Sequence, residues 1–321
     1  MSVKSLGHSV MGTPLGLGLG ELAQAGGRIF YVDSEKGRDG NTGLEPNTAK
    51  LTVNAAYAAC TTNKNDVIVL IPRATQYAIA ASAGILTWSK DYVHMVGAWA
   101  GNAGGARCRV VMPDAVSTPG IALSGDGCVF KNIQFLNSSN VAASGALVIT
   151  GNRNCFINCK IAAMIGATSA ASATAYTIKL TGAQENYFKN CVIGQDTVAR
   201  TTANKDVVFS TGARDNTFED CRFIMLAGSN AEFWLDLSAA SCVDGVTVFK
   251  DCLFLNSTKS GGTALTLGFS VNASGIGGLV VLKKCMFFGA AALCANTIAS
   301  VITDGAAAAG LGGLGLAAHT S

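Results

Sequence analysis

The chain has 321 residues, of which 23 are Lys or Arg, 20 are Asp or Glu and 38 are Gly. The charged share of 13% is about half that of an ordinary globular protein, and the apolar share of 49% excludes an intrinsically disordered chain. Gly does not recur at every third position, which excludes collagen, and a thinly spread net charge of +3 argues against a basic nucleic-acid-binding domain.

The first 28 residues are predicted to form an N-terminal arm. Pro14, Leu15, Leu17 and Leu19 belong to a stretch in which leucine alternates with glycine, and Glu21 follows it directly. These breaks do not fit the continuous apolar region of a secretory signal peptide, and no apolar run approaches the roughly 18 residues of a membrane-spanning helix. We therefore expect no membrane partner, and either a disordered end or an assembly arm that becomes ordered by lying along another subunit.

Residues 29–65 are predicted to form a strand, a polar loop and a short helix. The strand is expected at Ile29–Asp33 and the helix within Leu51–Cys60. Thr52 is a candidate N-cap, and three apolar residues spaced for one helical face follow it: Val53, Ala56 and Tyr57.

The sequence does not have the spacing of a metal or cofactor site. The loop Asp33–Asn41 lacks the alternating ligands and closing Glu of an EF-hand, so we interpret it as a polar turn. The three His residues are far apart, the chain has no Cys-X-X-Cys pair, and the glycines at 16–20 precede no phosphate-binding Lys. We expect neither a metal nor a cofactor.

Residues 66–295 carry a repeat. Three irregular strands are expected first, at Asp66–Pro72, Tyr92–Gly97 and Cys108–Met112. A six-residue pattern then recurs: Phe, any residue, Asn or Asp, Cys, any residue, and Phe or Ile. Its six copies start 26, 32, 30, 31 and 33 residues apart, and the first and last copies deviate in part: Phe130–Phe135, Phe156–Ile161, Phe188–Ile193, Phe218–Phe223, Phe249–Phe254 and Leu282–Phe287. Such regular spacing is typical of a stacked repeat protein.

Each repeat also holds a second short strand before the pattern. Examples are Ala146–Gly151, Tyr176–Gly182, Asp206–Gly212 and Phe233–Ser238. The units contain no helix of ten residues, which excludes ankyrin, tetratricopeptide and leucine-rich repeats, and they are too short for a propeller blade. Long loops of small residues at Ala162–Ala175 and Gly194–Asp206 are expected to supply an association face.

A unit of two or three strands cannot bury its apolar side chains alone, so successive units must stack as coils. Strand alternation points the first Phe and the Cys inward, and the Asn or Asp suits a bend with left-handed backbone. The expected core stack is Phe130, Phe156, Phe188, Phe218 and Phe249 with Cys159, Cys191, Cys221, Cys252 and Cys285. The expected structural ladder is Asn132, Asn158, Asn190, Asp220 and Asp251.

The 11 cysteines are interpreted as reduced. An odd number cannot pair fully within one chain, and five of them recur at the coil period rather than as the framework of a small disulfide-rich domain. We expect buried thiols that act as small apolar residues, in a chain made in a reducing cytoplasm.

With these features the sequence resembles right-handed parallel β-helix proteins of the pectate-lyase-like family, whose members carry such Asn ladders and inward stacks. It also resembles bacteriophage virion β-helix proteins. The resemblance is clearest over residues 120–290 and implies an all-β fold, a single-stranded right-handed parallel β-helix (solenoid) across residues 66–295. It further implies a short N-terminal capping helix and extended terminal arms, the second being the Gly-, Ala- and Leu-rich residues 296–321.

Many proteins of this fold act on polysaccharides, which raises the question of catalysis. Glycoside hydrolysis needs two carboxylates about 5–10 Å apart across a cleft. Asp215 and Asp244 fall at similar places before consecutive repeats, and the full set of outward acids is Glu185, Asp215, Glu219, Glu232, Asp236 and Asp244. No aromatic platform or base joins them in sequence, so we interpret them as solvated or turn-forming residues and expect no catalytic residue.

The resemblance and the low charge together favour a structural role. We expect a bacteriophage virion protein, a homotrimer that decorates or cements the capsid. Its terminal arm would bind the major capsid protein or another virion protein, and assembly would take place in the host cytoplasm. The alternative is a tail spike or fibre that binds host surface polysaccharide, with or without hydrolase or lyase activity. A secreted polysaccharide lyase fits less well, because the signal sequence is weak and the thiols are unpaired.

Overall fold

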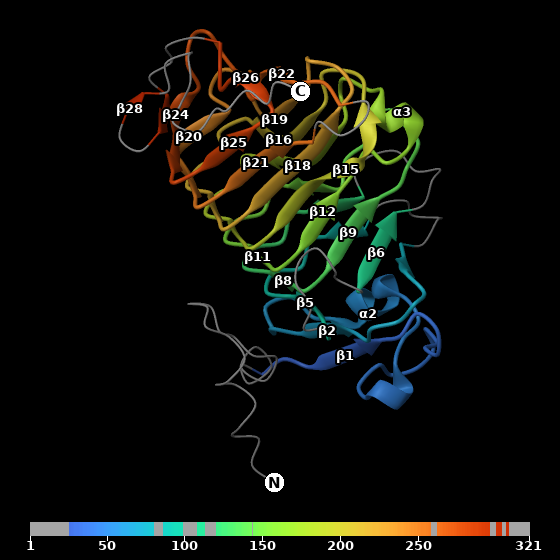
Figure 1. Ribbon diagram of the computed structural model, residues 1–321. Coiled ribbons are helices and arrows are strands. Elements are labelled where there is room, and N and C mark those ends of the chain that lie inside the picture. The colour runs from blue at the N-terminus through green and yellow to red at the C-terminus, as the bar shows by residue number, and fades with distance from the viewer. Residues whose placement is uncertain are drawn as a thin grey trace.

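The structure, a computed structural model, describes residues 26–79, 86–98, 108–112, 120–142, 144–257, 262–295, 300–303 and 306–307. The described strands wind into one solenoid, with the N-terminal strands at one end and the C-terminal strands at the other (Figure 1). The predicted arm residues Pro14, Leu15, Leu17 and Leu19 lie outside the described residues, as do most of residues 296–321. None of the described helices is long and apolar enough to cross a membrane.

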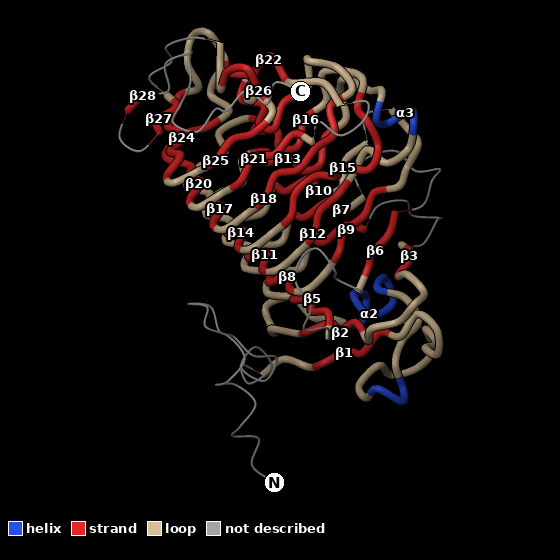
Figure 2. Tube along the Cα trace, viewed as in Figure 1, coloured by secondary structure: helices blue, strands red, loops and turns tan. Residues whose placement is uncertain are grey.

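Three sheets form the sides of the solenoid, and Figure 2 shows their strands side by side. All their strand pairs are parallel except the last pair of sheet A, β27 and β28. Sheet A contains β1 (Ile29–Val32), β2 (Val67–Leu70), β5 (His94–Gly97), β8 (Val129–Lys131), β11 (Cys155–Ile157), β14 (Tyr187–Lys189), β17 (Thr217–Glu219), β20 (Val243–Lys250), β24 (Gly277–Lys283), β27 (Val301–Thr303) and β28 (Ala306–Ala307). Sheet B contains β3 (Tyr77–Ala78), β6 (Arg109–Met112), β9 (Gln134–Asn137), β12 (Lys160–Ala162), β15 (Val192–Arg200), β18 (Arg222–Ala227), β21 (Leu253–Asn256) and β25 (Met286–Phe288). Sheet C contains β4 (Leu86–Trp88), β7 (Ile121–Leu123), β10 (Leu147–Ile149), β13 (Tyr176–Thr181), β16 (Lys205–Ser210), β19 (Phe233–Leu237) and β23 (Phe269–Val271).

Successive strands visit the three sheets in turn. After β11, β12 and β13 in sheets A, B and C, the chain returns to sheet A as β14, which pairs with β11 in parallel. From β8 to β21 each coil therefore adds one strand to every sheet, and a small extra pair, β22 (Leu265–Leu267) with β26 (Ala290–Ala292), follows near the C-terminal end. This arrangement confirms the predicted all-β solenoid of parallel strands.

The register of sheet A aligns the repeats residue by residue. Phe156 of β11 lies between Phe130 of β8 and Phe188 of β14. The five repeat phenylalanines are at most 1% exposed. Neighbouring ring centroids in this stack lie 4.5–4.9 Å apart, and the ring planes agree within 13°. Stacked, buried rings stabilise one another beyond the burial of their area, so this column is the spine of the core.

The helix α2 (Val53–Ala59) covers the N-terminal end of the core, as the sequence predicts. Thr52 Oγ1 accepts a hydrogen bond from Ala55 N at 3.1 Å, which makes Thr52 the N-cap. The three apolar residues predicted for one face are buried, and the Tyr57 ring lies 4.4 Å from the Trp88 ring. Because α2 covers the first coils, their apolar side chains do not face solvent at an open end.

The two long loops predicted between repeats are partly wrong. β15 continues to Arg200 and β16 begins at Lys205, so most of Gly194–Asp206 is strand. Within Ala162–Ala175 the short helix α3 (Ala167–Ala170) forms. Asn204 Nδ2 and Thr201 N both donate to Ala170 O, at 2.8 and 3.2 Å. The two segments stack on each other because backbone groups outside the regular sheets also need hydrogen-bond partners.

Sheet A extends past both ends of the predicted solenoid region. Its first strand, β1, belongs to residues 29–65 and pairs with β2 in parallel. Its later strand β27 belongs to residues 296–321 and pairs with β24 in parallel. The same side of the solenoid therefore runs from Ile29 to Thr303.

Shortening one ring of the phenylalanine stack should destabilise the fold strongly. We expect Phe188→Ala to lower the free energy of unfolding by about 3–5 kcal/mol, because a buried ring leaves a cavity between two neighbours. Lys189→Ala, the next residue on the outer face, should change it by about 0.5 kcal/mol or less. Urea unfolding followed by circular dichroism measures both, and equal midpoints for the two variants would contradict the stack as the spine of the core.

Candidate functional site

The predicted ladder residues occupy the bend between sheets A and B, one in each coil. All five have a positive φ, between 50° and 57°, and so does Lys284 in the drifted sixth copy. Asn158 Nδ2 donates to Asn132 Oδ1 at 2.7 Å, and Asn190 Nδ2 donates to Asn158 Oδ1 at 3.3 Å. Asp220 and Asp251 have no side-chain N–H with which to continue that chain of amides. The property shared along the whole column is therefore the left-handed backbone, which Asn and Asp tolerate well.

The repeat thiols line the inside of the same bend. Each Sγ lies 3.4 Å from a repeat phenylalanine carbonyl of the neighbouring coil, as Cys191 does from Phe156. None of the 11 cysteines forms a disulfide. Burial raises the pKa of the Cys159 and Cys221 thiols well above the usual value, which disfavours thiolate chemistry. Cys285 is only partly buried because it is the last residue of its column.

A second Asn ladder, which the sequence reasoning missed, lies buried at the bend between sheets C and A. Asn154, Asn186 and Asn216 are at most 1% exposed. Each Oδ1 accepts a backbone N–H from the preceding coil at 2.8–3.0 Å. Asp66 Oδ1 does the same for Arg28 N at 2.7 Å. These side chains satisfy backbone groups that the bend leaves without sheet partners. The signal was present: an Asn stands two residues before three of the repeat phenylalanines.

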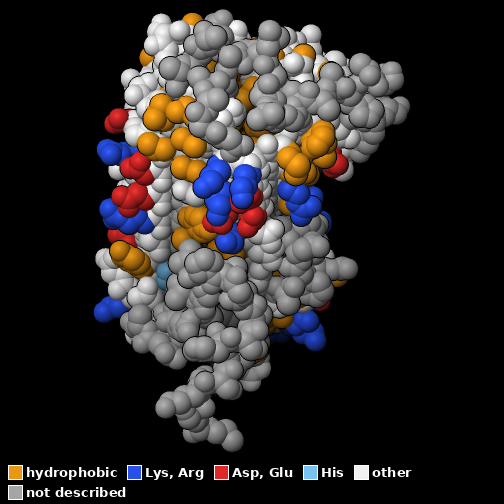
Figure 3. All heavy atoms as spheres, turned by 60° about the vertical axis from the view of Figure 1, so that its left-hand side comes forward, with side chains coloured by type: hydrophobic (Ala, Val, Ile, Leu, Met, Phe, Trp, Pro, Cys, Tyr) orange, Lys and Arg blue, Asp and Glu red, His pale blue; other side chains and the backbone are white. Residues whose placement is uncertain are grey.

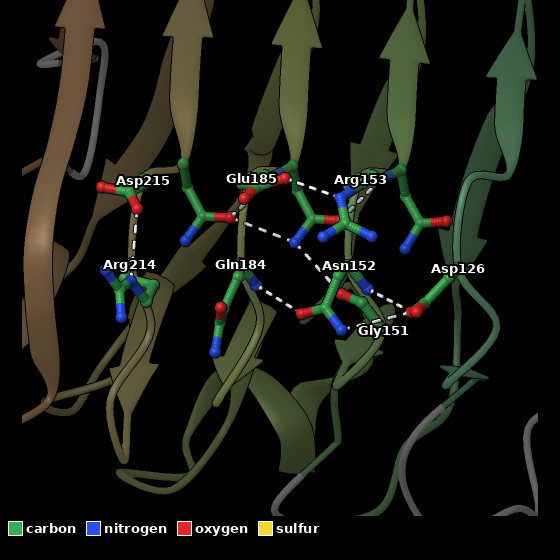
Figure 4. A network of polar contacts seen from close by, with 11 residues as sticks. Asp126, Gly151, Asn152, Arg153, Gln184, Glu185, Arg214 and Asp215 are labelled. Carbon is green, nitrogen blue, oxygen red and sulfur yellow. Dashed lines mark hydrogen bonds and ion pairs between the residues drawn. The ribbon is translucent and has the colours of Figure 1, made fainter.

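The outside of the C–A bend carries two of the candidate acids, Glu185 and Asp215, at equivalent positions of adjacent coils (Figure 4). Glu185 forms an ion pair with Arg153 at 2.7 Å, and Asp215 with Arg214 at 3.2 Å. All four side chains are more than 40% exposed. General acid catalysis needs a carboxyl sheltered from solvent, so this exposed network suits the stabilisation of a turn.

The predicted correspondence of Asp215 with Asp244 is wrong by one residue. Ala213 pairs with Val243, which places Asp244 beside Arg214 and Asp215 beside Gly245. The cause is the bulge of β20 between Val243 and Val246, which shifts the register. Asp244 instead lines a depression of 460 Å³ together with Thr211 and Ser241. Its lining contains one carboxylate rather than the pair that glycoside hydrolysis needs.

Glu219 is the centre of a charged cluster on the outer face of sheet A. Its carboxylate accepts hydrogen bonds from the Tyr187 hydroxyl and, at 2.9 Å, from Lys250 Nζ, and it lies 3.6 Å from Lys189 Nζ. The bonds from Tyr187 and Lys250 lower the pKa of Glu219 to about 2, and burial raises the pKa of Tyr187. At neutral pH the carboxylate has no proton to give and the phenol keeps its own, so the cluster suits charge pairing or binding better than acid–base catalysis.

The last two candidate acids lie elsewhere. Asp236 of β19 lies 3.5 Å from Lys205 Nζ on the outside of sheet C. Glu232, predicted to point outward, is fully buried, because its carboxylate turns back to accept hydrogen bonds from Ser229 N and Oγ. Among the described residues, no group of three His, Cys, Asp or Glu side chains is placed to hold a metal ion.

The outer face of sheet A carries an uncharged row, one side chain per coil, which the sequence reasoning also missed. Its members are the residues directly before the inward-facing ones, and we call them the outer row: Ile29, Val67, His94, Val129, Cys155, Tyr187, Thr217, Val248, Val281 and Ile302. His94 counts as uncharged because burial lowers its pKa to about 4. From Val129 to Ile302 the row is partly exposed. Figure 3 shows a cluster of charged side chains at the centre of the view, further charged side chains along its left edge and on its right, and hydrophobic side chains beside and above the central cluster.

The outer face of sheet B becomes apolar towards the C-terminal end. Met286 and Phe288 of β25 are 54% and 39% exposed, and they lie in register with Leu253 and Leu255 of β21. Val246 and Leu279 of sheet A, 39% and 37% exposed, lie in register with each other and form a separate exposed apolar pair. Exposed apolar side chains that cluster in this way are typical of interaction surfaces.

Removal of the buried ladder should cost more than alteration of the outer one. We expect Asn186→Ala to lower the free energy of unfolding by about 2–4 kcal/mol, because Asn154 N and Gly151 O lose their partner without gaining water. Asn190→Asp, which keeps the residue type found in two neighbouring coils, should stay within about 0.5 kcal/mol. The difference is measured by urea unfolding, and a larger effect at Asn190 would contradict this ranking of the ladders.

Thiol labelling of the native protein should be slow and selective. Cys155 and Cys285 are partly exposed and the other nine cysteines are buried. We therefore expect a maleimide reagent to modify Cys155 and Cys285 first and the rest only in denaturant, with peptide mass spectrometry as the readout. Rapid native modification of Cys191 or Cys221 would contradict the buried column.

Comparison with known proteins identifies the fold. No family model and no curated protein matches the sequence. Among solved structures, pectate lyase Pel9A aligns with a TM-score of 0.58 at 17% identity over 82% of this chain and 70% of its own. A rhamnogalacturonan lyase aligns with a TM-score of 0.59 at 14% identity over 82% and 68%, and the pectin methylesterase from carrot with 0.53 at 15% over 92% and 89%. At such identities the likeness concerns the fold alone, and it is one shared with enzymes that process polysaccharides. The chain is a right-handed parallel β-helix.

Proposed function

We propose that this β-helix is a structural component of a bacteriophage particle that associates with copies of itself as a homotrimer and decorates or cements the capsid. Attachment to the major capsid protein, or to another virion protein, is assigned to the N-terminal arm with Pro14, Leu15, Leu17 and Leu19. The particle is the site of action, and the host cytoplasm is the place of assembly. The observation that carries this proposal is the uncharged outer row, and the virion setting rests on the sequence resemblance stated above.

The partly exposed part of the outer row runs through seven strands, from Val129 to Ile302, and spans about 29 Å at about 4.8 Å per coil. The next outward row, about 7 Å away, is charged at most positions: Lys131, Lys189, Glu219, Lys250 and Lys283. The outer row is therefore a narrow uncharged strip beside a charged one. A solenoid needs no uncharged outer row for its own folding, because its apolar core lies inside the coils.

A second copy is the partner that suits such a face. Its side chains recur at the coil spacing, and another β-helix of the same kind presents the same spacing along its whole length. Cysteines without disulfides support assembly in a reducing compartment, since such a compartment does not form structural disulfides. The low charge of the chain lowers the repulsion between copies that lie side by side.

The second candidate function is that of a tail spike or fibre that binds host surface polysaccharide. The cluster of Tyr187, Lys189, Glu219 and Lys250 favours it, because a phenol and two ammonium groups on an outer face suit acidic sugars. The shared fold with polysaccharide-processing enzymes favours it as well. The protonation states of Glu219 and Tyr187 favour binding over turnover, so we rank this function second.

Charges placed in the outer row should break the oligomer. We expect the wild-type chain to be a trimer in sedimentation velocity and Val248→Lys/Val281→Lys to be a monomer, because ammonium groups would be buried between copies. Val148→Lys/Val208→Lys, which makes the same change at partly exposed positions of sheet C, should remain trimeric. A monomeric wild type, or equal dissociation of both variants, would contradict the outer row as the contact surface.

The particle partner is tested separately. The full chain, mixed with capsids that lack it, should bind them, and a chain without residues 1–25 should fold but not bind. Release of reducing ends or unsaturated sugars from host polysaccharide, without capsid binding, would instead support the second function.

A further inference from the structure

A fully buried ion pair lies at the bend between sheets B and C. Arg200 ends β15 and Asp206 is the second residue of β16, and both side chains are 0% exposed. Arg200 Nη2 donates to Asp206 Oδ1 at 2.6 Å, and Thr177 Oγ1 of β13 donates to the same oxygen at 3.3 Å. Charges enter a protein interior at a high cost in desolvation, so the surroundings must supply further partners.

Many of the buried polar atoms at this bend have no hydrogen-bond partner among the described residues. Nine buried side-chain atoms have no partner there, and six of them belong to this bend: Arg200 Nε and Nη1, Thr202 Oγ1, Asn204 Oδ1, Asp206 Oδ2 and Trp234 Nε1. The set contains donors and acceptors together. Orphaned buried polar atoms are rare, and each one costs free energy unless water or an ion completes it.

A second buried carboxyl belongs to the same bend. Glu232 is 0% exposed and lies two residues before Trp234. In the register of β16 and β19, Trp234 lies beside Asp206. The positive charge of Arg200 acts on Glu232 as well as on Asp206. Only Asp206 bonds to the guanidinium, whereas Glu232 bonds to Ser229, so ionising both carboxyl groups would leave an uncompensated buried charge.

We propose that this bend is an internal solvent site in which ordered water bridges Arg200, Asp206 and their neighbours, and which takes up a proton on mild acidification. Water suits the mixed donors and acceptors better than a simple anion, since an anion would be repelled by the two carboxyl groups. When one of the two carboxyl groups binds a proton, a single carboxylate remains, and Arg200 balances its charge.

The electrostatics of the bend agree with this assignment. Burial raises the pKa of Asp206 to about 6 against the opposing effect of Arg200, and burial also raises the pKa of Glu232. The groups that face Asp206 are Arg200 from β15, Thr177 from β13 and Trp234 from β19, while Lys205 and Asp236 pair with each other outside the bend. The folded chain binds the Asp206 proton more tightly than the unfolded chain. The stabilising contribution of Asp206 to the free energy of unfolding is therefore complete below about pH 4 and is lost as the pH rises through about 6.

The site also connects neighbouring coils. The loop between Arg200 and Asp206 donates two hydrogen bonds to Ala170 O of α3, from Thr201 N and Asn204 Nδ2. These two bonds hold the loop at 201–204 against α3 of the neighbouring coil.

A crystal structure at a resolution that reveals water tests the solvent site directly. We expect ordered water within hydrogen-bonding distance of Arg200 Nη1 and Asp206 Oδ2. Side chains that pair with each other and leave no solvent density would overturn the proposal, and so would an anomalous peak that identifies an ion.

Asp206→Asn tests the proton, because an amide keeps the size of the side chain and does not titrate. We expect the urea midpoint of the wild-type chain to fall as the pH rises from about 5 to about 7, and that of Asp206→Asn to fall less. Asp236→Asn, an acid of the next coil paired with Lys205, is the matched control and should keep the wild-type slope. Parallel curves for the wild type and Asp206→Asn would overturn the proposal.

Infrared titration of the wild-type chain needs no variant and remains informative if Asp206→Asn does not fold. A carboxylic-acid C=O band should grow as the pH falls from about 7 to about 5, above the range in which exposed Asp and Glu side chains titrate. A band that grows only below about pH 4.5 would overturn the proposal.

Discussion

The in-register parallel pairing of sheet A is the constraint on which the rest of this protein depends. Because Phe130, Phe156 and Phe188 are direct strand neighbours, every residue between them is placed by its distance from the repeat phenylalanine. A slip of one residue in one coil would turn its rings outward and misalign both bends. The same constraint brings the thiols, the two Asn ladders and the outer row into columns.

The sequence was sufficient to predict the features that depend on this period. The spacing of the Phe-X-Asn-Cys pattern predicted the coil, the inward stack and the left-handed bend, and capping rules predicted α2 from Thr52. The buried ladder was missed because its Asn residues lie outside the six-residue pattern: Asn154 and Asn186 stand two residues before the repeat phenylalanine. Which Asn is buried follows from the path of the bend rather than from residue type.

The candidate site was less accessible to prediction for a physical reason. Acids were grouped by their distance from the repeat, but the bulge in β20 moved Asp244 by one position, and the bend between sheets B and C turned Glu232 inward. Bulges and bends depend on tertiary packing and carry weak local signals. Composition could not locate the low charge within the fold either. The outer row accounts for a part of it, because it is one uncharged column of sheet A next to a column that carries Lys189, Glu219 and Lys250.

The cap formed by α2 has a consequence for how the chain reaches its fold. It lies near the start of the sequence and covers the first coils, so the N-terminal end of the solenoid is complete before the later coils have been synthesised. Each later coil then meets a finished strand edge on all three sides and needs only residues that have just left the ribosome. A β-helix closed first at its N-terminal end can thus grow in the direction of translation, without waiting for its last residues.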